Sequence, residues 1–317
     1  MTELYSGDFG EHAETRPTAL EADGLGKRYR RGWALRNCSF RLPAGRICAM
    51  VGPNGAGKST LMSIAAHLLA PTEGTVELFG RPLDAPENQG RIGYAAQDKP
   101  LYGGFTVAET LRLGRDLNPS WDQAKAEALL AGGRFPHSAR IGSLSGGQRT
   151  RVSLAVALGK QPDLLILDEP MSDLDPLARH ELMGLLMAEA AERGTTVLMS
   201  SHVVAELEDA CDYLVLLADG KVLLAGDIEE LLDAHLLVTA AVTEDGTPAE
   251  LASHQVIETR RNGRQLTALL RPDGPLPGGW HAETPTLGEL LLAHLRASGV
   301  PALLTDEARP AAAAVAA

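Results

Sequence analysis

The stretch Gly52-Pro-Asn-Gly-Ala-Gly-Lys-Ser59 fits the pattern G-x-x-x-x-G-K-[ST] of a phosphate-binding loop, or P-loop. An apolar run over 46–52 precedes it and is typical of a buried strand. Apolar residues at helical spacing predict a helix over 58–70 after it. Because the positive end of that helix dipole would point at the loop, this strand–loop–helix order predicts a site for the phosphates of a nucleotide.

Each part of the loop has a chemical reason. Glycines permit a tight turn that points successive backbone N–H groups inward. Lys58 adds a positive charge, Ser59 offers a hydroxyl to Mg²⁺, and Thr60 can reach another phosphate. The predicted nucleotide contacts in this loop are Gly52, Asn54, Gly55, Ala56, Gly57, Lys58, Ser59 and Thr60.

The surrounding chain alternates between strand and helix patterns. Apolar runs over 164–167 and 195–200 predict two further buried strands, and a helix is predicted over 176–193 between them. Such runs separated by helices indicate an α/β fold with a parallel sheet covered on both faces. Between Gln97 and Leu144 the strand signal disappears, and helices are predicted over 106–117 and 121–131. We therefore expect a helical insertion over about 98–160.

Two acids follow the apolar run at 164–167. Asp168 would lie at the carboxyl edge of the sheet next to the P-loop, where it can hold Mg²⁺ through water. Glu169 lies one residue further out and can orient or deprotonate a water in line with the γ-phosphate. An acidic pair after a strand is more often a solvated strand end, so this interpretation depends on the P-loop upstream.

A second glycine-rich segment, Leu144-Ser-Gly-Gly-Gln-Arg149, precedes a helix predicted over 148–160. Glycines and a serine at a helix N-terminus form an anion site. A single chain has no second triphosphate to fill it. The natural partner of Ser145, Gly146, Gly147 and Gln148 is therefore a nucleotide held by another copy.

Composition narrows the possible partners of the 317-residue chain. Its net charge of −12 argues against general affinity for nucleic acid or anionic lipid. No charge-free apolar stretch is long enough to span a membrane, and the N-terminus carries acids where a secretory signal has a basic region. We expect a cytosolic protein. Cys38, Cys48 and Cys211 stand in apolar contexts that suit reduced, buried thiols rather than disulfides or zinc ligands.

The segment 144–149 resembles the signature motif of the ATP-binding-cassette (ABC) ATPases, and other motifs follow in that family's order. Tyr29 matches its adenine-stacking aromatic, Gln97 its glutamine loop, Ser172-Asp-Leu-Asp175 its D-loop, and His202 its switch histidine. One departure is Asp173, which stands where a glycine is common. The resemblance covers roughly 18–233 and implies a cassette with a parallel core, an antiparallel β subdomain and the helical insertion.

The resemblance also implies a mechanism. ATP and Mg²⁺ would be bound, with Ser59, Gln97 and Asp168 as metal ligands and Glu169 and His202 as catalytic residues. Two nucleotides would be sandwiched head to tail in a homodimer, in which Asp175 also takes part. Closing and opening of this dimer would drive a separate transmembrane permease. Binding to that permease would place the chain on the cytoplasmic face of the membrane. No contact with nucleic acid and no direct membrane span are expected.

A different class of function remains open, that of a soluble ABC ATPase acting on ribosomes, DNA or iron–sulphur assembly. Ribosome-acting relatives usually carry two cassettes in one chain, and chromosome-type relatives separate the P-loop from the signature by a long coiled coil. Neither feature is in this sequence. A non-catalytic scaffold is disfavoured because Glu169 and His202 are both present.

The flanks carry weaker patterns. Residues 1–17 have no defined pattern, and the Ala-rich tail over 309–317 predicts disorder. Between them, 234–308 is expected to form a small α/β appendage, with strands over 236–242 and 265–270, a hairpin turn at Asn262-Gly263 and a helix over 286–297. The segment 284–295 resembles the terminal helix of the family's drug- and peptide-export branch, which favours export. A regulatory ligand site and a packing role both remain open for the appendage.

Overall fold

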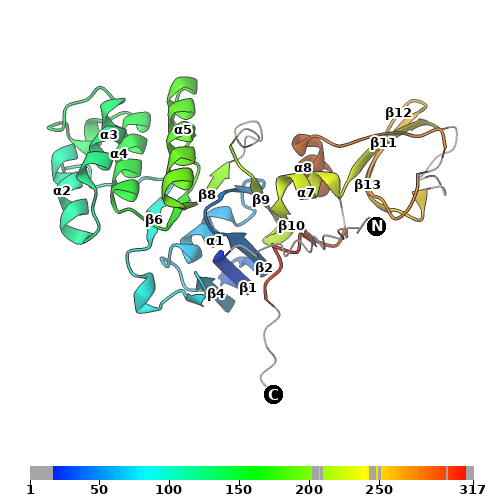
Figure 1. Ribbon diagram of the computed structural model, residues 1–317, viewed down its shortest axis with the longest axis horizontal. Helices are drawn as coiled ribbons and strands as arrows, with labels where there is room; N and C mark the ends of the chain where they lie inside the picture. Colours follow the sequence, from blue (N-terminus) through cyan, green and yellow to red (C-terminus); the bar gives the residue numbers. More distant parts are fainter. Residues whose placement is uncertain are drawn as a thin grey trace, which may run out of the picture.

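The computed structural model describes residues 17–201, 207, 210–242, 248, 251–276, 278–297 and 299–311. Three sheets organise these residues. Figure 1 shows a helical lobe with α2, α3 and α4 at one end, the central sheet in the middle, and the hairpin strands β11, β12 and β13 at the other end.

The central sheet has seven strands in the order β15-β10-β9-β3-β8-β7-β6. Its parallel part consists of β6 (Ile92–Ala95), β7 (Leu164–Leu167), β8 (Thr196–Ser201), β3 (Ile47–Val51) and β9 (Tyr213–Ala218). Every residue of β3, β7 and β8 is buried, as expected for strands covered on both faces. The α/β class and the three strands predicted from apolar runs are confirmed. The antiparallel strand β10 (Lys221–Asp227) and the two-residue β15 (Leu303–Leu304) complete one edge.

Two helices follow the strands of this sheet that carry the P-loop and the acids. The helix α5 (Pro176–Arg193) matches its prediction and ends at Gly194, whose φ of 66° closes the helix in the left-handed region. The helix α1 (Lys58–Ala65) is shorter than predicted. Its end is set by His67, which has φ 58° and whose N–H donates to Ile64 O at 2.8 Å, a tight closing turn that the apolar spacing did not reveal.

The helical insertion contains α2 (Val107–Leu117), α3 (Gln123–Ala131) and α4 (Gly146–Gly159). Thr106 and Glu109 form a capping box that starts α2. The side chain of Trp121 packs against two helices of this lobe. A Cβ on Gly114 or on Gly159 would lie 2.7 Å from its ring, so the indole lies directly on the backbones of α2 and α4.

A second sheet of four antiparallel strands has the order β2-β1-β4-β5. Its members are β1 (Thr18–Tyr29), β2 (Gly32–Pro43), β4 (Glu73–Leu78) and β5 (Arg81–Pro82). Leu25, Leu35 and Phe40 of this sheet are buried in one cluster with Leu61 and Met62 of α1. The sheet therefore covers the helix that follows the P-loop and provides the expected antiparallel subdomain.

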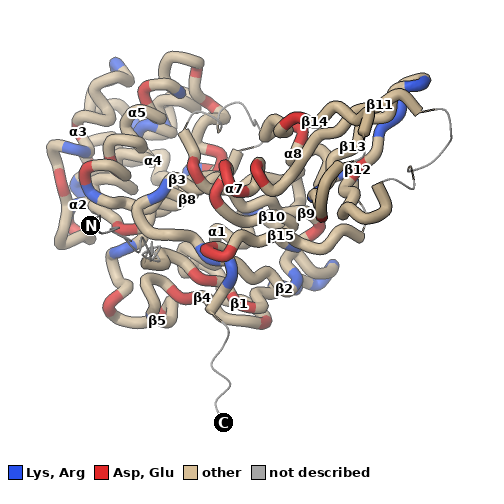
Figure 2. The backbone as a smooth tube through the Cα atoms, turned by 45° about the vertical axis from the view of Figure 1, so that its right-hand side comes forward, with Lys and Arg blue, Asp and Glu red and all other residues tan. Residues whose placement is uncertain are grey.

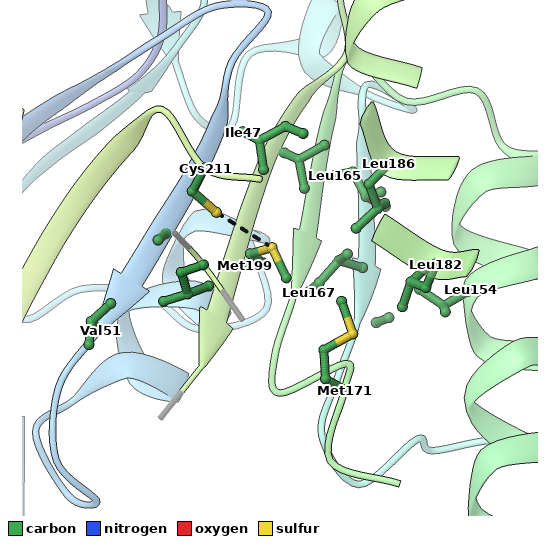
Figure 3. Close-up of a cluster of buried hydrophobic side chains, with 14 of the residues drawn as sticks. Ile47, Val51, Leu154, Leu165, Leu167, Met171, Leu182, Leu186, Met199 and Cys211 are labelled. Carbon is green, nitrogen blue, oxygen red and sulfur yellow. Dashed lines mark hydrogen bonds between the residues drawn. The ribbon is translucent and has the colours of Figure 1, made fainter. Parts of the chain in front are cut away.

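The other core cluster lies between the central sheet and the helices α4 and α5. Figure 3 shows Leu165 and Leu167 of β7 directed toward Leu182 and Leu186 of α5. Cys211 lies in the same cluster, with its Sγ 4.0 Å from Met199 Sδ. Burial raises the pKa of Cys211 to about 12, which keeps this thiol protonated.

The C-terminal part forms the third sheet, in the order β12-β13-β11-β14. Its strands are β11 (Leu236–Ala241), β12 (Gln255–Asn262), β13 (Gln265–Arg271) and β14 (His281–Glu283). The helix α7 (Ile228–Asp233) precedes this sheet and α8 (Leu287–Arg296) follows it. The hairpin turn falls at Asn262–Gly263 as predicted, and Thr286 caps α8.

The end of the chain requires a correction. We expected one appendage over 234–308 and disorder from 309, but the segment 303–311 returns to the main body. Strand β15 pairs with β10, Arg41 N–H donates to Ala308 O at 2.9 Å, and Ala311 N–H donates to Glu21 Oε1 at 3.0 Å. Backbone pairing, which the sequence pattern does not encode, holds this segment. The arm at 1–16 and the residues 312–317 lie outside the described part. No helix among the described residues is long and apolar enough to cross a bilayer.

Candidate nucleotide-binding site

The P-loop connects β3 to α1, and its backbone requires glycine at two positions. Gly52 has φ 155° and Gly57 has φ 108°. A Cβ on Gly52 would lie 2.0 Å from Leu217 O, and one on Gly57 would lie 2.6 Å from Ala34 O. These close approaches to β9 and β2 leave no room for a side chain. The loop is thus built as a backbone cradle.

Lys58 is the first residue of α1 and is buried. Its Nζ donates to Gly52 O at 2.7 Å and to Pro53 O at 3.4 Å, so the ammonium group lies inside the turn. Ser59 is exposed and Thr60 is half-buried at the same helix start. A cation and the N–H groups of the helix start therefore lie at one backbone segment, which fits a chain of phosphates.

The acids Asp168 and Glu169 follow β7 directly. Asp168 is only 3% exposed, and its Oδ1 accepts a hydrogen bond from Ser200 Oγ at 2.7 Å. The same Ser200 oxygen accepts the N–H of Glu169 at 2.8 Å. Glu169 has φ 52°, a left-handed conformation that costs free energy in a residue other than glycine. Ser200 of β8 thus fixes both acids, a role that we did not predict.

Parallel strands bring the predicted residues to one edge. Gln97 is exposed two residues after β6, Asp168 follows β7, and the P-loop follows β3, so all lie at carboxyl ends of strands in one sheet. Tyr29 comes from the other sheet, at the end of β1, where Lys27 Nζ lies 5.6 Å from its ring centroid. His202, which would follow β8 at the same edge, lies outside the described residues.

The signature segment starts α4 two residues earlier than predicted. Ser145 is the N-cap: its Oγ accepts Gln148 N–H at 3.3 Å, and Gln148 Oε1 accepts Ser145 N–H at 3.0 Å. This capping box orders the helix N-terminus. A Cβ on Gly146 would lie 3.0 Å from Asp173 Cγ, and one on Gly147 would lie 2.9 Å from Asp173 O. The two glycines therefore admit the neighbouring loop at 172–175.

That loop ends at Asp175, which caps α5 by accepting Ala178 N–H at 2.9 Å. Its other acid, Asp173, forms an ion pair with Lys99. The sequence marked Asp173 only as a departure from the common glycine, and its pairing with Lys99 was not predicted. The signal for it in the sequence is weak, because the two residues lie in separate segments.

The donor set also fits a divalent cation of the Mg²⁺ type. A serine hydroxyl (Ser59) and a carboxylate (Asp168) are hard oxygen ligands, which Mg²⁺ prefers together with phosphate oxygens. The hydrogen bond from Ser200 orients the Asp168 carboxylate. The arrangement can therefore bind a metal-complexed nucleoside triphosphate and present an acid, Glu169, beside it.

Comparisons with known proteins agree with this geometry. Residues 35–172 match the family model described as "ABC transporter". The uncharacterized ABC transporter ATP-binding protein YxlF of Bacillus subtilis is 37% identical over 218 residues, which are 67% of this chain and 72% of that protein. Nod factor export ATP-binding protein I of Cupriavidus pinatubonensis is 31% identical over 275 residues, 84% of each chain.

Solved structures give the same picture. The dimeric structure of MJ0796, a bacterial ABC transporter cassette, has a TM-score of 0.60 and 26% identity, and the match covers 66% of this chain and 98% of that one. A post-hydrolysis state of the same cassette, bound to ADP and Pi, matches with the same TM-score, identity and coverage.

Proposed function

Because the chain belongs to the family of ABC transporter ATP-binding proteins, we propose that Lys58, Asp168 and Glu169 form the centre at which it hydrolyses ATP to power export. The chain is an ATPase that acts as the ATP-binding subunit of a transporter, through a separate membrane protein. The observation that carries the residue assignment is the shared anchor of the two acids on Ser200, at the sheet edge that bears the P-loop.

Binding begins at the cradle. Lys58 Nζ, which donates to Gly52 O and Pro53 O, exchanges these carbonyls for phosphate oxygens, because a charged acceptor makes the stronger hydrogen bond. The backbone N–H groups of the loop and of the start of α1 bind the remaining oxygens. Tyr29, partly exposed at the end of β1, stacks on the adenine.

Ser59, Asp168 and Gln97 are the residues that would hold Mg²⁺. When bound, the ion neutralises charge on the phosphate oxygens. Asp168 is held ready for this contact by the Ser200 hydroxyl. Gln97 lies on the exposed segment after β6, so its contact needs that segment to approach the nucleotide.

Glu169 accepts the proton of the attacking water, in line with the γ-phosphate. Its left-handed backbone and its N–H bond to Ser200 set the direction in which the carboxylate leaves the strand. We assign His202 to the γ-phosphate from its place in the motif order, two residues after Ser200.

The composite site needs two copies. In this proposal the capped N-terminus of α4, with Ser145, Gly146, Gly147 and Gln148, faces the ATP held by the other copy, and Asp175 lies beside it. The dimeric state of the related cassette supports a homodimer of this kind.

The contact with the membrane subunit is assigned to the start of the helical insertion. Tyr102 is 67% exposed, and its ring centroid lies 5.2 Å from that of Phe105. Two aromatic rings exposed a few residues after Gln97 are a suitable anchor for a cytoplasmic loop of a permease. The chain would then be peripheral on the cytoplasmic face. Export, rather than import, is supported by the Nod factor export relative, which matches most of both chains.

The proposal is tested by pairing two measurements on the full chain. Phosphate release with Mg-ATP reports hydrolysis, and co-sedimentation with membranes containing the cognate permease reports coupling. A Tyr102→Ser, Phe105→Ser double variant should keep its phosphate release and lose co-sedimentation. As a matched control, Leu117→Ser removes an equally exposed apolar side chain at the far end of α2 and should keep both. An active chain that never binds such membranes would support the soluble ATPase instead.

A further inference from the structure

The loop before α5 places a negative charge at the start of the signature helix α4. Two close approaches of Asp173 show this. Its Cγ lies 3.0 Å from where a Cβ on Gly146 would be, and its carbonyl oxygen lies 2.9 Å from where a Cβ on Gly147 would be. Met171, two residues earlier, is buried beside Leu167 and Leu182 (Figure 3), which anchors the loop in this position. The Asp173 side chain is 45% exposed.

Such a charge conflicts with the function proposed for α4. The N-terminus of a helix carries a partial positive charge that attracts phosphate. An unpaired carboxylate in contact with the first turn would cancel that attraction and repel the triphosphate of the second copy.

Lys99 resolves this conflict. It comes from the segment after β6 and reaches Asp173, with which it forms an ion pair, although its side chain is only 10% exposed. Its backbone has φ 46°, its N–H donates to Ala96 O at 3.0 Å, and its carbonyl accepts Leu101 N–H at 2.7 Å. The lysine is therefore held in a tight turn that directs its ammonium group toward the start of α4.

We propose that Lys99 is a positioning residue that neutralises Asp173 at the start of α4, so that this helix can accept the triphosphate held by a second copy. This inference rests on the proposed function. It gives Asp173 a role as well, because the ion pair joins the segment after β6, which carries Gln97, to the start of α4. Without Lys99, the charge of Asp173 would be unfavourable there, and without Asp173, the side chain of Lys99 would lose its partner.

The proposal predicts an unusual ranking of variants by the strength of their ATP-dependent dimerisation. Removing the cation alone, by Lys99→Met, leaves Asp173 charged and should weaken ATP-dependent dimerisation by about tenfold, the effect of one unit charge several ångströms from the phosphates at the dielectric of a protein surface. Asp173→Asn should dimerise within about threefold of the parent. The double variant Lys99→Met, Asp173→Asn should recover nearly all of the loss, because no unpaired charge remains.

The experiment measures dimerisation by sedimentation velocity with Mg-ATP, in a Glu169→Gln parent that retains its nucleotide. Affinity of the monomer for a fluorescent ATP analogue and the melting temperature show that each variant is folded and binds. Arg151→Gln is the matched control: it breaks an α4–α5 ion pair whose acid, Glu181, is as exposed as Asp173 but meets α4 at Arg151, five residues after its first residue, Gly146. It should change dimerisation by less than about threefold, because the freed charge lies about a turn and a half further along α4 and is screened by solvent.

Recovery in the double variant supports the proposal, since a merely structural role of Lys99 would leave the double variant as weak as Lys99→Met. Added salt should also shrink the Lys99→Met deficit, because it screens the exposed carboxylate. Lys99→Met dimerising like its parent, or a double variant without recovery, overturns the inference while the proposed function stands. A parent that binds ATP and never dimerises overturns the sandwich itself and the inference with it.

Discussion

The hydroxyl of Ser200 donates to Asp168 Oδ1 at 2.7 Å across the neighbouring strands β8 and β7, and both residues are buried. Because the same hydroxyl also accepts the N–H of Glu169, one side chain anchors the carboxylate of Asp168 and the backbone of Glu169. Ser200→Ala should therefore lower kcat by about tenfold to a hundredfold, through misplacement of the acids.

The Ser200→Ala variant should also lose about 1–3 kcal/mol in its free energy of unfolding, because a buried carboxylate loses its donor. Ser200→Thr keeps the hydroxyl and should recover most of the activity. Steady-state phosphate release and urea denaturation measure the two effects. Normal turnover in Ser200→Ala would mean that the acids do not depend on this anchor.

Lys58→Ala should weaken ATP binding by about a hundredfold or more, since truncating one partner of a buried, hydrogen-bonded charge pair costs several kcal/mol. Titration with a fluorescent ATP analogue gives the dissociation constant. Lys160→Ala, which removes a lysine from the other end of α4, serves as the control and should bind normally. Tight binding by Lys58→Ala would exclude the P-loop as the phosphate site.

Glu169→Gln should bind ATP and dimerise while phosphate release falls by about 10²–10⁴-fold, because glutamine cannot take a proton from water. Removing a negative charge beside the triphosphate should further favour the closed dimer. Size-exclusion chromatography with Mg-ATP would show the dimer, with the wild-type chain mostly monomeric. Near-normal turnover in the variant would assign the base to another group.

Two glycines of the P-loop allow a matched test of the cradle. A methyl group on Gly52 would lie 2.0 Å from Leu217 O, whereas one on Gly55 meets no atom of the described residues within 4 Å. Gly52→Ala should lower the free energy of unfolding by about 3 kcal/mol or more, from overlap and strain together. Gly55→Ala should lose only about 1–2 kcal/mol, from its φ of 82°. Equal losses in urea denaturation would contradict the geometry.

A buried histidine pair predicts a pH dependence in the C-terminal part. His294 Nε2 lies 3.1 Å from His235 Nε2, and His235 Nδ1 lies 2.6 Å from Leu231 O, to which it donates. Burial, followed by the neighbouring His235 and Arg271, lowers the pKa of His294 to about 4, and burial likewise lowers that of His235.

The sign of the effect follows from these shifts. Well above pH 6.5, the ordinary pKa of histidine, both rings are neutral whether the chain is folded or unfolded. As the pH falls from about 6.5 to 4, the unfolded chain binds protons that the folded one does not, so stability is lost in that window. The melting temperature of wild type should fall there, and His294→Leu should reduce the slope. His281→Asn, at an exposed histidine of β14, should leave the slope unchanged.

Local patterns predicted the elements that hold the P-loop and its acids. The run of apolar residues before Gly52 predicted the buried strand β3, and the helix predicted over 176–193 matches α5 at both ends. The helix after the P-loop was predicted too long, because apolar spacing continues past the point where the backbone of His67 turns.

Three of the missed features depend on contacts between distant segments. Ser200 anchors acids that belong to another strand, and Lys99 finds Asp173 across the fold. Neither pairing has a local signature, since a serine at a strand end or a lysine in a turn is ordinary in isolation. The strand β15 has two residues, too few for any periodicity, so its addition to the sheet edge could not be foreseen.

The return of the chain at β15 has a mechanical consequence. The polypeptide leaves the central sheet at Asp227 and rejoins it at Leu303, so the third sheet and α8 form a closed excursion with two covalent anchors. Figure 2 shows β10 and β15 side by side. The described chain then ends at Ala311, whose N–H donates to Glu21 of β1 and not to the third sheet. A force applied at the C-terminus would therefore act on the ATP-binding part of the chain before it reached the third sheet. Trimming the chain from that end would strip β10 of its neighbour before it shortened the distal sheet by a single residue.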